Sequence, residues 1–253
     1  MADWPAALLW DVDGTLAETE LEGHRLAFNA AFSEAGLPWQ WDPTAYLELL
    51  RISGGRERIR QFLLEAEGSL PAPERVEALQ AAKQRHYSAL LASGAVQLRP
   101  GVERLLRDAA AQGVRQVIVT TSGRAAVQAL LERLLPDQPQ LWEFWVCGED
   151  VRRKKPDPSA YQQALAQLAL PAAAVLAVED SGNGVAAAVG AGLRVLVTRS
   201  RSSAAEPDRL FAAATAELDQ LGEPGCPCVV RRGPACPKGW VTLSYLQQLG
   251  FAA

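Results

Sequence analysis

Acidic, hydroxyl and basic side chains stand at the ends of several short apolar runs in this sequence. The acidic and hydroxyl residues at these ends are Asp11 and Asp13, Thr121 and Ser122, and Glu179 and Asp180. If the ends of the runs meet, four carboxylates converge and repel one another unless a cation neutralises them. A set of oxygen ligands suits Mg²⁺ better than zinc. The sequence therefore predicts a magnesium site.

The first acidic pair has the spacing of a nucleophile beside an acid. Asp11 and Asp13 are two residues apart, so on a regular strand both point the same way, and Gly14 lets the chain turn its backbone N–H groups toward an anion. One carboxylate can attack phosphorus and form an aspartyl-phosphate, while a second protonates the leaving oxygen and then activates water. Lys155, the Thr121 hydroxyl and Mg²⁺ would neutralise the phosphoryl charge.

The elements that must position these residues alternate between strands and helices. The expected strands are 6–13, 116–122, 141–147, 175–181 and 193–200, with a weaker sixth at 210–214. Helices are expected after Gly101, after Ser122, over 157–170 and after Ser181. Apolar runs rich in Val, Leu and Ile between helices are typical of parallel strands buried on both faces. The pattern predicts an α/β protein with a Rossmann-like, doubly wound parallel sheet, whose carboxyl edge binds ligands.

The first two strands are separated by far more chain than an ordinary connection needs. Apolar residues in this stretch recur at helical spacing, as at Phe28 and Phe32 and at Ile59, Phe62 and Leu63. We therefore expect a helical cap domain over 17–97, inserted into a core domain made of 1–16 and 98–253. The hinges would lie at 16–17 and 97–100. The tail over 222–239 is expected to be irregular, followed by a short helix at 243–249.

Composition narrows the possible partners. The 253 residues include 25 Lys and Arg and 29 Asp and Glu, a net charge of −4, which gives no general attraction to nucleic acid or anionic membranes. The sequence shows no membrane-spanning run and no signal-peptide pattern at its start, and four cysteines are too few for a disulfide scaffold. We expect a cytoplasmic monomer that acts on a small molecule.

Four motifs together resemble a known family. DVDGT at 11–15, VTTS at 119–122, KKPDP at 154–158 and VEDSGNG at 178–184 are similar, in this order, to the motifs of haloacid-dehalogenase (HAD) superfamily phosphotransferases. The insertion resembles the helical cap of the β-phosphoglucomutase-like subgroup. Within it, the segments 17–32, 36–41 and 53–59 most resemble CbbY-like phosphatases associated with the Calvin cycle.

The resemblance implies a role for each motif residue. Asp11 would be the nucleophile and Asp13 the general acid/base, and an acid at the second position favours phosphoryl transfer over dehalogenation. Thr121 and Lys155 would hold the phosphoryl oxygens. The Mg²⁺ ligands would be Asp11, Asp13 through its backbone carbonyl, Asp180, and Glu179 as a ligand or a neighbour of the ligands.

The same resemblance implies a substrate. CbbY-like phosphatases remove one phosphate from xylulose-1,5-bisphosphate, a Rubisco inhibitor, and return xylulose-5-phosphate. A bisphosphate needs cations at both ends, and the candidates for the far phosphate and the sugar hydroxyls are Arg56, His24 and Arg124, with Ser122. The other expected substrate contacts are Glu18, Glu20, Arg25, Gly54 and Gly55. Closure of the cap would exclude bulk water.

Each motif also has a purely structural interpretation. Asp-x-Asp-Gly could be a turn, and the acidic pair at 179–180 could cap the next helix. Lys155 could belong to a solvated basic cluster over 152–155, and His24 could be a packed interdomain histidine. The run over 54–56 could simply begin a helix.

Two rival functions remain at this point. A phosphomutase of the β-phosphoglucomutase type shares all four motifs and transfers the phosphoryl group to sugar instead of water. A non-catalytic phosphosugar-binding module could keep the same fold. Zinc binding by Cys226, Cys228 and Cys236 would lack a fourth ligand, and a dinucleotide site is disfavoured because no G-x-G-x-x-G follows the first strand.

Overall fold

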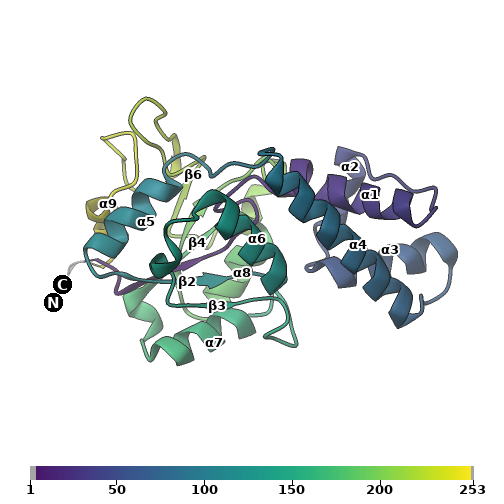
Figure 1. The fold of residues 1–253 in the computed structure, drawn as a ribbon. Coiled ribbons are helices and arrows are strands. Elements are labelled where there is room, and N and C mark those ends of the chain that lie inside the picture. The colour runs from purple at the N-terminus through teal and green to yellow at the C-terminus, as the bar shows by residue number, and fades with distance from the viewer. Residues whose placement is uncertain (1–3, 252–253) are drawn as a thin grey trace.

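A seven-stranded sheet forms the centre of the computed structural model, which describes residues 4–251 (Figure 1). The strands are β1 (Ala7–Trp10), β2 (Arg115–Val119), β3 (Phe144–Val146), β4 (Val175–Glu179), β5 (Arg194–Thr198), β6 (Ala216–Leu218) and β7 (Val230–Arg232). Their order is β3-β2-β1-β4-β5-β6-β7, and all pair in parallel except β7, which is antiparallel to β6. The predicted doubly wound α/β sheet is confirmed.

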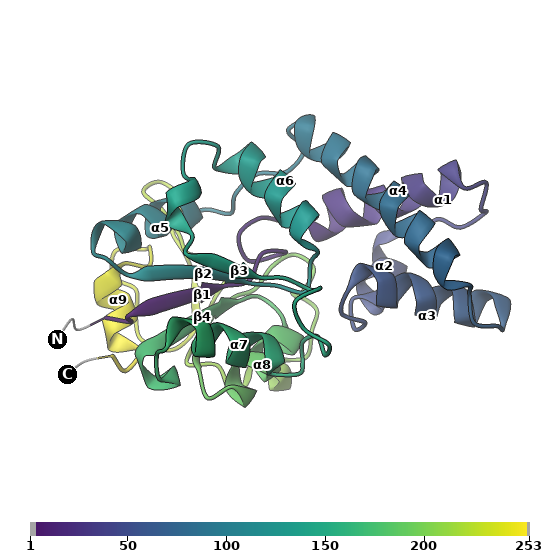
Figure 2. The same cartoon turned by 60° about the horizontal axis from the view of Figure 1, so that its bottom comes forward.

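Helices cover both faces of the sheet (Figure 2). Leu8 and Trp10 of β1 pack toward α5 (Val102–Ala111), α6 (Arg124–Leu134) and α9 (Leu243–Gln248), whereas Ala7 and Leu9 pack toward α7 (Ser159–Leu168) and α8 (Gly182–Gly190). Alternate residues of one strand thus enter two separate apolar clusters, as the period of two requires. Both faces of β1 are buried, which explains its unbroken apolar sequence.

The chain between β1 and α5 is mostly helical and lies beyond one end of the sheet (Figure 1). Its elements are the π-helix η1 (Glu20–His24), α1 (Arg25–Glu34), α2 (Pro43–Leu49), α3 (Gly55–Glu67) and α4 (Pro73–Ala92). They share an apolar cluster of their own, formed by Phe28, Phe32, Trp41, Tyr46, Ile59, Leu63, Val76 and Leu79. We propose that these helices are the cap domain expected over 17–97.

The cap and the sheet are also joined through apolar packing. Tyr87 and Leu91, near the end of α4, belong to the sheet-side cluster that contains α6. The two connecting segments run side by side, since Ala17 forms a β-bridge with Leu98 and the backbone N–H of Arg99 donates to the Leu16 carbonyl at 2.9 Å. Among the described residues, no helix is both long enough and apolar enough to cross a membrane.

Three expected boundaries are corrected by the structure. β1 ends at Trp10, so Asp11 and Asp13 stand in the turn that follows, where Gly14 has a φ of 86°. The sixth strand is Ala216–Leu218 and not 210–214. The expected range overlaps a short 3₁₀ helix over Asp208–Phe211, from which Phe211 buries its ring against the sheet.

The tail over 222–239 is also not wholly irregular, since β7 lies within it. The three residues of β7 include only one apolar side chain, Val230. The alternation of apolar and polar residues that indicates a strand is therefore too short to recognise in the sequence. The expected last helix, by contrast, is present as α9.

Candidate active site

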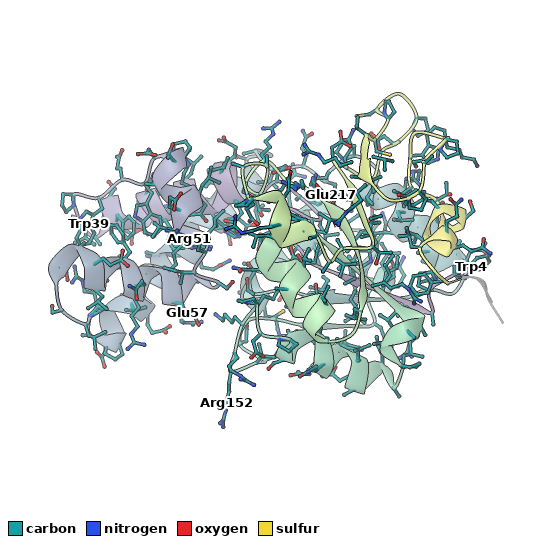
Figure 3. The ribbon with its side chains drawn as sticks, turned by 180° about the vertical axis from the view of Figure 1, so that it is seen from behind. Trp4, Trp39, Arg51, Glu57, Arg152 and Glu217 are labelled. Atoms are coloured by element: carbon teal, nitrogen blue, oxygen red, sulfur yellow. The ribbon has the colours of Figure 1, made fainter. Side chains whose placement is uncertain are left out.

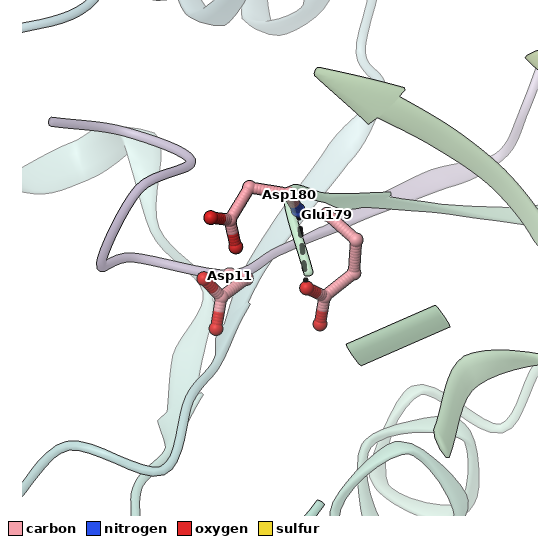
Figure 4. A group of neighbouring side chains, drawn as sticks. All are labelled: Asp11, Glu179 and Asp180. Atoms are coloured by element: carbon pink, nitrogen blue, oxygen red, sulfur yellow. Dashed lines mark hydrogen bonds between the residues drawn. The ribbon is translucent and has the colours of Figure 1, made fainter. Parts of the chain in front are cut away.

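Three carboxylates meet at the carboxyl edge of the sheet (Figure 4). Asp11 follows β1, Glu179 ends β4, and Asp180 comes next. One carboxylate oxygen of each lies within 4.8 Å of the others, and all three residues are buried. Because β1 and β4 are parallel neighbours, their ends bring together residues that are more than 160 positions apart in the chain.

Burial and mutual repulsion disfavour the ionised forms of the carboxylates in this cluster. Burial, together with the nearby charge of Glu179 and despite the opposing charge of Lys155, raises the pKa of Asp11 to about 7. Burial and the charges of Asp11 and Glu179 raise the pKa of Asp180 well above its ordinary value. A divalent cation would remove this repulsion, and an all-oxygen donor set fits Mg²⁺.

Lys155 supplies one positive charge to this cluster. Its Nζ donates to Asp11 Oδ1 at 2.8 Å, to Glu179 Oε1 at 2.6 Å and to the Val119 carbonyl at 2.7 Å. Although burial opposes it, the charges of Asp11 and Glu179 raise the pKa of Lys155 above its ordinary value. Glu179 Oε1 also accepts from the Tyr161 hydroxyl at 2.5 Å. Glu179 therefore belongs to the carboxylate cluster and also holds Lys155.

The basic run over 152–155 does not behave as one solvated cluster. Arg152 and Arg153 are exposed, and Figure 3 shows Arg152 projecting away from the protein. Lys154 donates to Glu57 of α3 at 2.8 Å, which links the cap to the core. Lys155 is buried, with 4% of its side chain exposed.

Asp13 turns away from the carboxylate cluster and toward the cap. It accepts from Thr19 Oγ1 at 2.5 Å, from His24 Nε2 at 2.8 Å and from the Ser122 hydroxyl. Burial alone would raise the pKa of Asp13, but the charge of His24 and these hydrogen bonds outweigh burial and hold that pKa well below its ordinary value. Asp13 is therefore ionised in the free protein.

His24 is buried and engaged on both ring nitrogens. Lys83 Nζ lies 2.8 Å from Nδ1, and Asp13 Oδ1 lies 2.8 Å from Nε2. The ring stacks on Tyr87 with 4.2 Å between centroids. Burial lowers the pKa of Lys83 to about 8. His24 therefore contacts Asp13 and the cap interior, which matches the packed-histidine interpretation.

A cavity opens between the carboxylate cluster and the cap. From the core it is lined by the cluster residues Asp11 and Asp180, by Asp13, Thr121 and Lys155, and by Ser181, Asn183, Ser202, Ser203 and Glu206. From the cap it is lined by Glu20, Leu50, Ser53 and Arg58. The expected phosphoryl-binding residues thus face the same space as the two aspartates.

Arg58, which was not among the expected substrate contacts, lines the cavity where Arg56 was expected to do so. Arg58 is buried, and it donates to the Tyr46 hydroxyl at 3.0 Å, which in turn donates to Glu20 at 2.5 Å. Arg56 instead pairs with Glu77 at 2.6 Å on the surface. The two arginines stand about 200° apart around α3, so only one can face the cavity. The helical period over 55–63 places Arg56 and Arg58 on different faces of the helix, but only the packing of α3 shows which face meets the cavity.

Three other residues expected at the substrate lie elsewhere. Arg124 pairs with Asp150 at 2.6 Å on the surface. Arg25 donates to backbone carbonyls within the cap, and Glu18 pairs with Arg99 at 3.3 Å near the hinges. In each case a nearer partner satisfies the charge, which sequence spacing does not show.

The glycines and Ser122 complete the expected set. Gly54, with a φ of 95°, precedes α3 beside Lys154, and Gly55 begins that helix near Gln80. They shape the cap loop whose Ser53 lines the cavity. Ser122 binds Asp13 instead of facing the cap loop.

Comparisons with known proteins agree with this geometry. The model of the haloacid dehalogenase-like hydrolase family matches residues 5–192. Protein CbbY of Rhodobacter capsulatus is 45% identical over 225 residues, covering 85% of this chain and 98% of that protein.

Two crystal structures of CbbY from Rhodobacter sphaeroides superpose with a TM-score of 0.80, each covering 87% of this chain and 96% of the other. One, 39% identical, is a complex with phosphate. The other, 38% identical, is a mutant in complex with xylulose-1,5-bisphosphate.

Proposed function

Since this chain belongs to the haloacid dehalogenase-like hydrolase family, we propose that it is a Mg²⁺-dependent phosphatase that converts xylulose-1,5-bisphosphate to xylulose-5-phosphate. The observation that carries the proposal is the buried Asp11, held by Lys155 at one side of a cavity that Asp13 also lines. The structural similarity to a CbbY crystallised with this bisphosphate supports the substrate. We propose that the protein works as a monomer in the cytoplasm, without nucleic acid or membrane.

In the first step, a carboxylate oxygen of Asp11 attacks phosphorus and the bond to the sugar oxygen breaks, which leaves an aspartyl-phosphate. The charge of Lys155 favours the anionic form of Asp11 against the effect of burial, and Lys155 and Thr121 bind the phosphoryl oxygens. Mg²⁺, held by Asp11 and Asp180 with Glu179 beside them and the Asp13 carbonyl as a further ligand, would supply charge neutralisation.

Asp13 acts as the general acid in the first step and as the general base in the second. The negative charge of an arriving phosphate raises the pKa of the neighbouring Asp13, which favours the protonated form that the leaving sugar oxygen needs. After it has given up that proton, the carboxylate takes one from the water that attacks the aspartyl-phosphate. His24, Thr19 and Ser122 hold the carboxylate in place for both steps.

Arg58 is our candidate for the far phosphate. It is a cap cation that lines the cavity, and Ser53 and Asn183 lie beside it with polar groups for the sugar hydroxyls. His24 is reassigned from the substrate to Asp13. Glu20 stays a candidate sugar contact, because it lines the cavity and is fixed by Tyr46.

The test is phosphate release with Mg²⁺ from xylulose-1,5-bisphosphate, with xylulose-5-phosphate and β-glucose-1-phosphate measured in parallel. We expect the bisphosphate to be preferred and its product to be the 5-phosphate. Conversion of β-glucose-1-phosphate to glucose-6-phosphate would instead support the mutase. Asp11→Asn should abolish release, while Asp108→Asn on the surface of α5 retains it; equal activity of the two variants would exclude Asp11 as nucleophile.

A further inference from the structure

Arg99 is a buried cation with an unusual set of partners. It stands in the second connection between cap and core, and its side chain is 7% exposed. Its guanidinium donates to four backbone carbonyls, those of Gly14, Thr198, Arg199 and Asp219, the last three at 2.6–2.7 Å. The Thr198 hydroxyl at 3.1 Å and Glu18 at 3.3 Å from Nε complete the set.

These carbonyls lie at the ends of three strands on the catalytic edge. Gly14 lies in the turn after β1, Thr198 and Arg199 at the end of β5, and Asp219 directly after β6. Arg99 therefore links the three segments that follow β1, β5 and β6. The planar guanidinium can do this because its five N–H groups point in fixed directions, whereas a lysine has three donors on one atom.

The hydrogen bond from Arg99 to Gly14 lies next to the residues proposed to react. Gly14 directly follows Asp13, and a Cβ atom at Gly14 would collide with the Asp180 carboxylate. Gly14, whose carbonyl Arg99 binds, thus follows the proposed acid in the chain and has its Cα packed close to a proposed metal ligand, Asp180. A shift of Gly14 would move Asp13 relative to the cavity.

Arg99 is also fixed to the hinge. Its backbone N–H donates to Leu16 of the first connection, and its Nε pairs with Glu18 of the same segment. One residue therefore links both connections of the cap to the turn that carries Asp13.

We propose that Arg99 is a positioning residue that fixes the Asp13–Gly14 turn against the cap hinges, so that Asp13 is aimed at the leaving oxygen. This inference rests on the proposed acid role of Asp13. It extends that role by naming the residue that sets the geometry of the acid from outside the cavity.

The test compares two leaving groups in Arg99→Lys. A sugar phosphate needs a proton on its leaving oxygen, whereas p-nitrophenyl phosphate does not. The comparison is made on the first step alone, as release of xylulose-5-phosphate or of p-nitrophenol in a single turnover, because the later attack of water on the aspartyl-phosphate also uses Asp13 and is common to both substrates. We expect the rate of this first step to fall about tenfold or more for the sugar bisphosphate, with KM within about threefold, and to stay within about threefold for p-nitrophenyl phosphate. Equal losses on both substrates, or none on either, would overturn the proposal.

Two further variants keep the result interpretable. Arg104→Lys is the matched control, because Arg104 also donates to a backbone carbonyl, that of Gly222 at 2.9 Å, and neither residue lines the cavity or belongs to the carboxylate cluster. This variant should leave both substrates unaffected. If Arg99→Lys does not fold, Thr198→Val removes one acceptor of the guanidinium. That variant should show a smaller loss, about two- to fivefold, again confined to the sugar substrate; the lack of such a selective loss overturns the proposal.

Asp13→Asn separates this inference from its premise. If that variant also loses the first step selectively with the sugar substrate, the acid role stands and the Arg99 result decides the inference alone. If Asp13→Asn slows the first step equally with both substrates, the acid role fails and the positioning proposal fails with it.

Discussion

At the scale of single residues, the site is organised around charge that burial makes costly. Asp11, Glu179 and Asp180 face one ammonium, Lys155, in a space closed to bulk water. The pKa values of Asp11 and Asp180 are raised because one positive charge does not balance three buried carboxylates. A cation must therefore compete with protons for these oxygens.

This competition predicts that Mg²⁺ binds more weakly in acid. With the pKa of Asp11 raised to about 7, the metal-free carboxyl is mostly protonated at pH 6 and mostly ionised at pH 8, so binding releases a proton at the lower pH. Titration calorimetry should show about tenfold weaker Mg²⁺ binding at pH 6 than at pH 8. Asp108→Asn should behave like the parent, and equal affinity at both pH values would contradict the prediction.

The two arginines of α3 predict a second contrast at this scale. Arg58→Met should raise KM for the bisphosphate about 10- to 100-fold, because a charged hydrogen bond to phosphate is worth about 1.5–3 kcal/mol. Arg56→Met should change KM less than about twofold, since it loses only a surface pair with Glu77. Steady-state kinetics on the bisphosphate and on p-nitrophenyl phosphate would show this, and a larger effect from Arg56 would restore its original assignment.

At the scale of elements, helix α8 makes room for the cluster by having a glycine, Gly184, where it approaches Glu179. A Cβ atom at Gly184 would overlap the Glu179 carboxylate, whereas one at Gly190 of the same helix would only touch Pro158 at 3.4 Å. The sequence VEDSGNG thus serves packing as well as chemistry. Ser181 begins the helix by accepting from the Gly184 N–H at 3.2 Å.

These two glycines give a matched pair of substitutions. Gly184→Ala should destabilise the protein by about 1–3 kcal/mol through overpacking and lower kcat, because Glu179 would be pushed from Lys155. Gly190→Ala should be neutral or stabilising by up to about 1 kcal/mol, since Gly190 is the last residue of α8, has room for a Cβ atom, and alanine has the higher helix propensity. Denaturant unfolding and kcat would be measured on both, and a harmless Gly184→Ala would refute the packing argument.

At the scale of the whole molecule, the cap is not independent of the core. The end of α4 packs into the sheet-side cluster against α6, while the rest of the cap has its own aromatic cluster. Lys154 and Glu57 add an ion pair between the two parts. Motion of the cap must therefore leave the end of α4 in place and bend elsewhere in the connections.

Leu91 tests this shared packing. Leu91→Ala should lower the free energy of unfolding by about 2–5 kcal/mol, because it opens a cavity in the sheet-side cluster. Leu70→Ala, at an exposed position of the cap, should stay within about 0.5 kcal/mol of the parent. Chemical denaturation of the full chain distinguishes them, and a small effect of Leu91→Ala would show that α4 is not part of the core.

The sequence by itself determined the sheet and the convergence of Asp11 and Asp180. Parallel strands place their carboxyl ends at one edge, so residue types at those ends predict a shared site without any knowledge of contacts. The same local patterns predicted the helical insertion between the first two strands.

Only the tertiary structure decided which cations face the cavity and what holds Asp13. Arg58 replaces Arg56 because the face of α3 depends on how the helix packs in the cap. Arg99 contacts carbonyls 85 to 120 residues away in the chain. No period or motif records such contacts, because a side chain that binds distant backbone is selected by the fold around it and not by its neighbours in sequence.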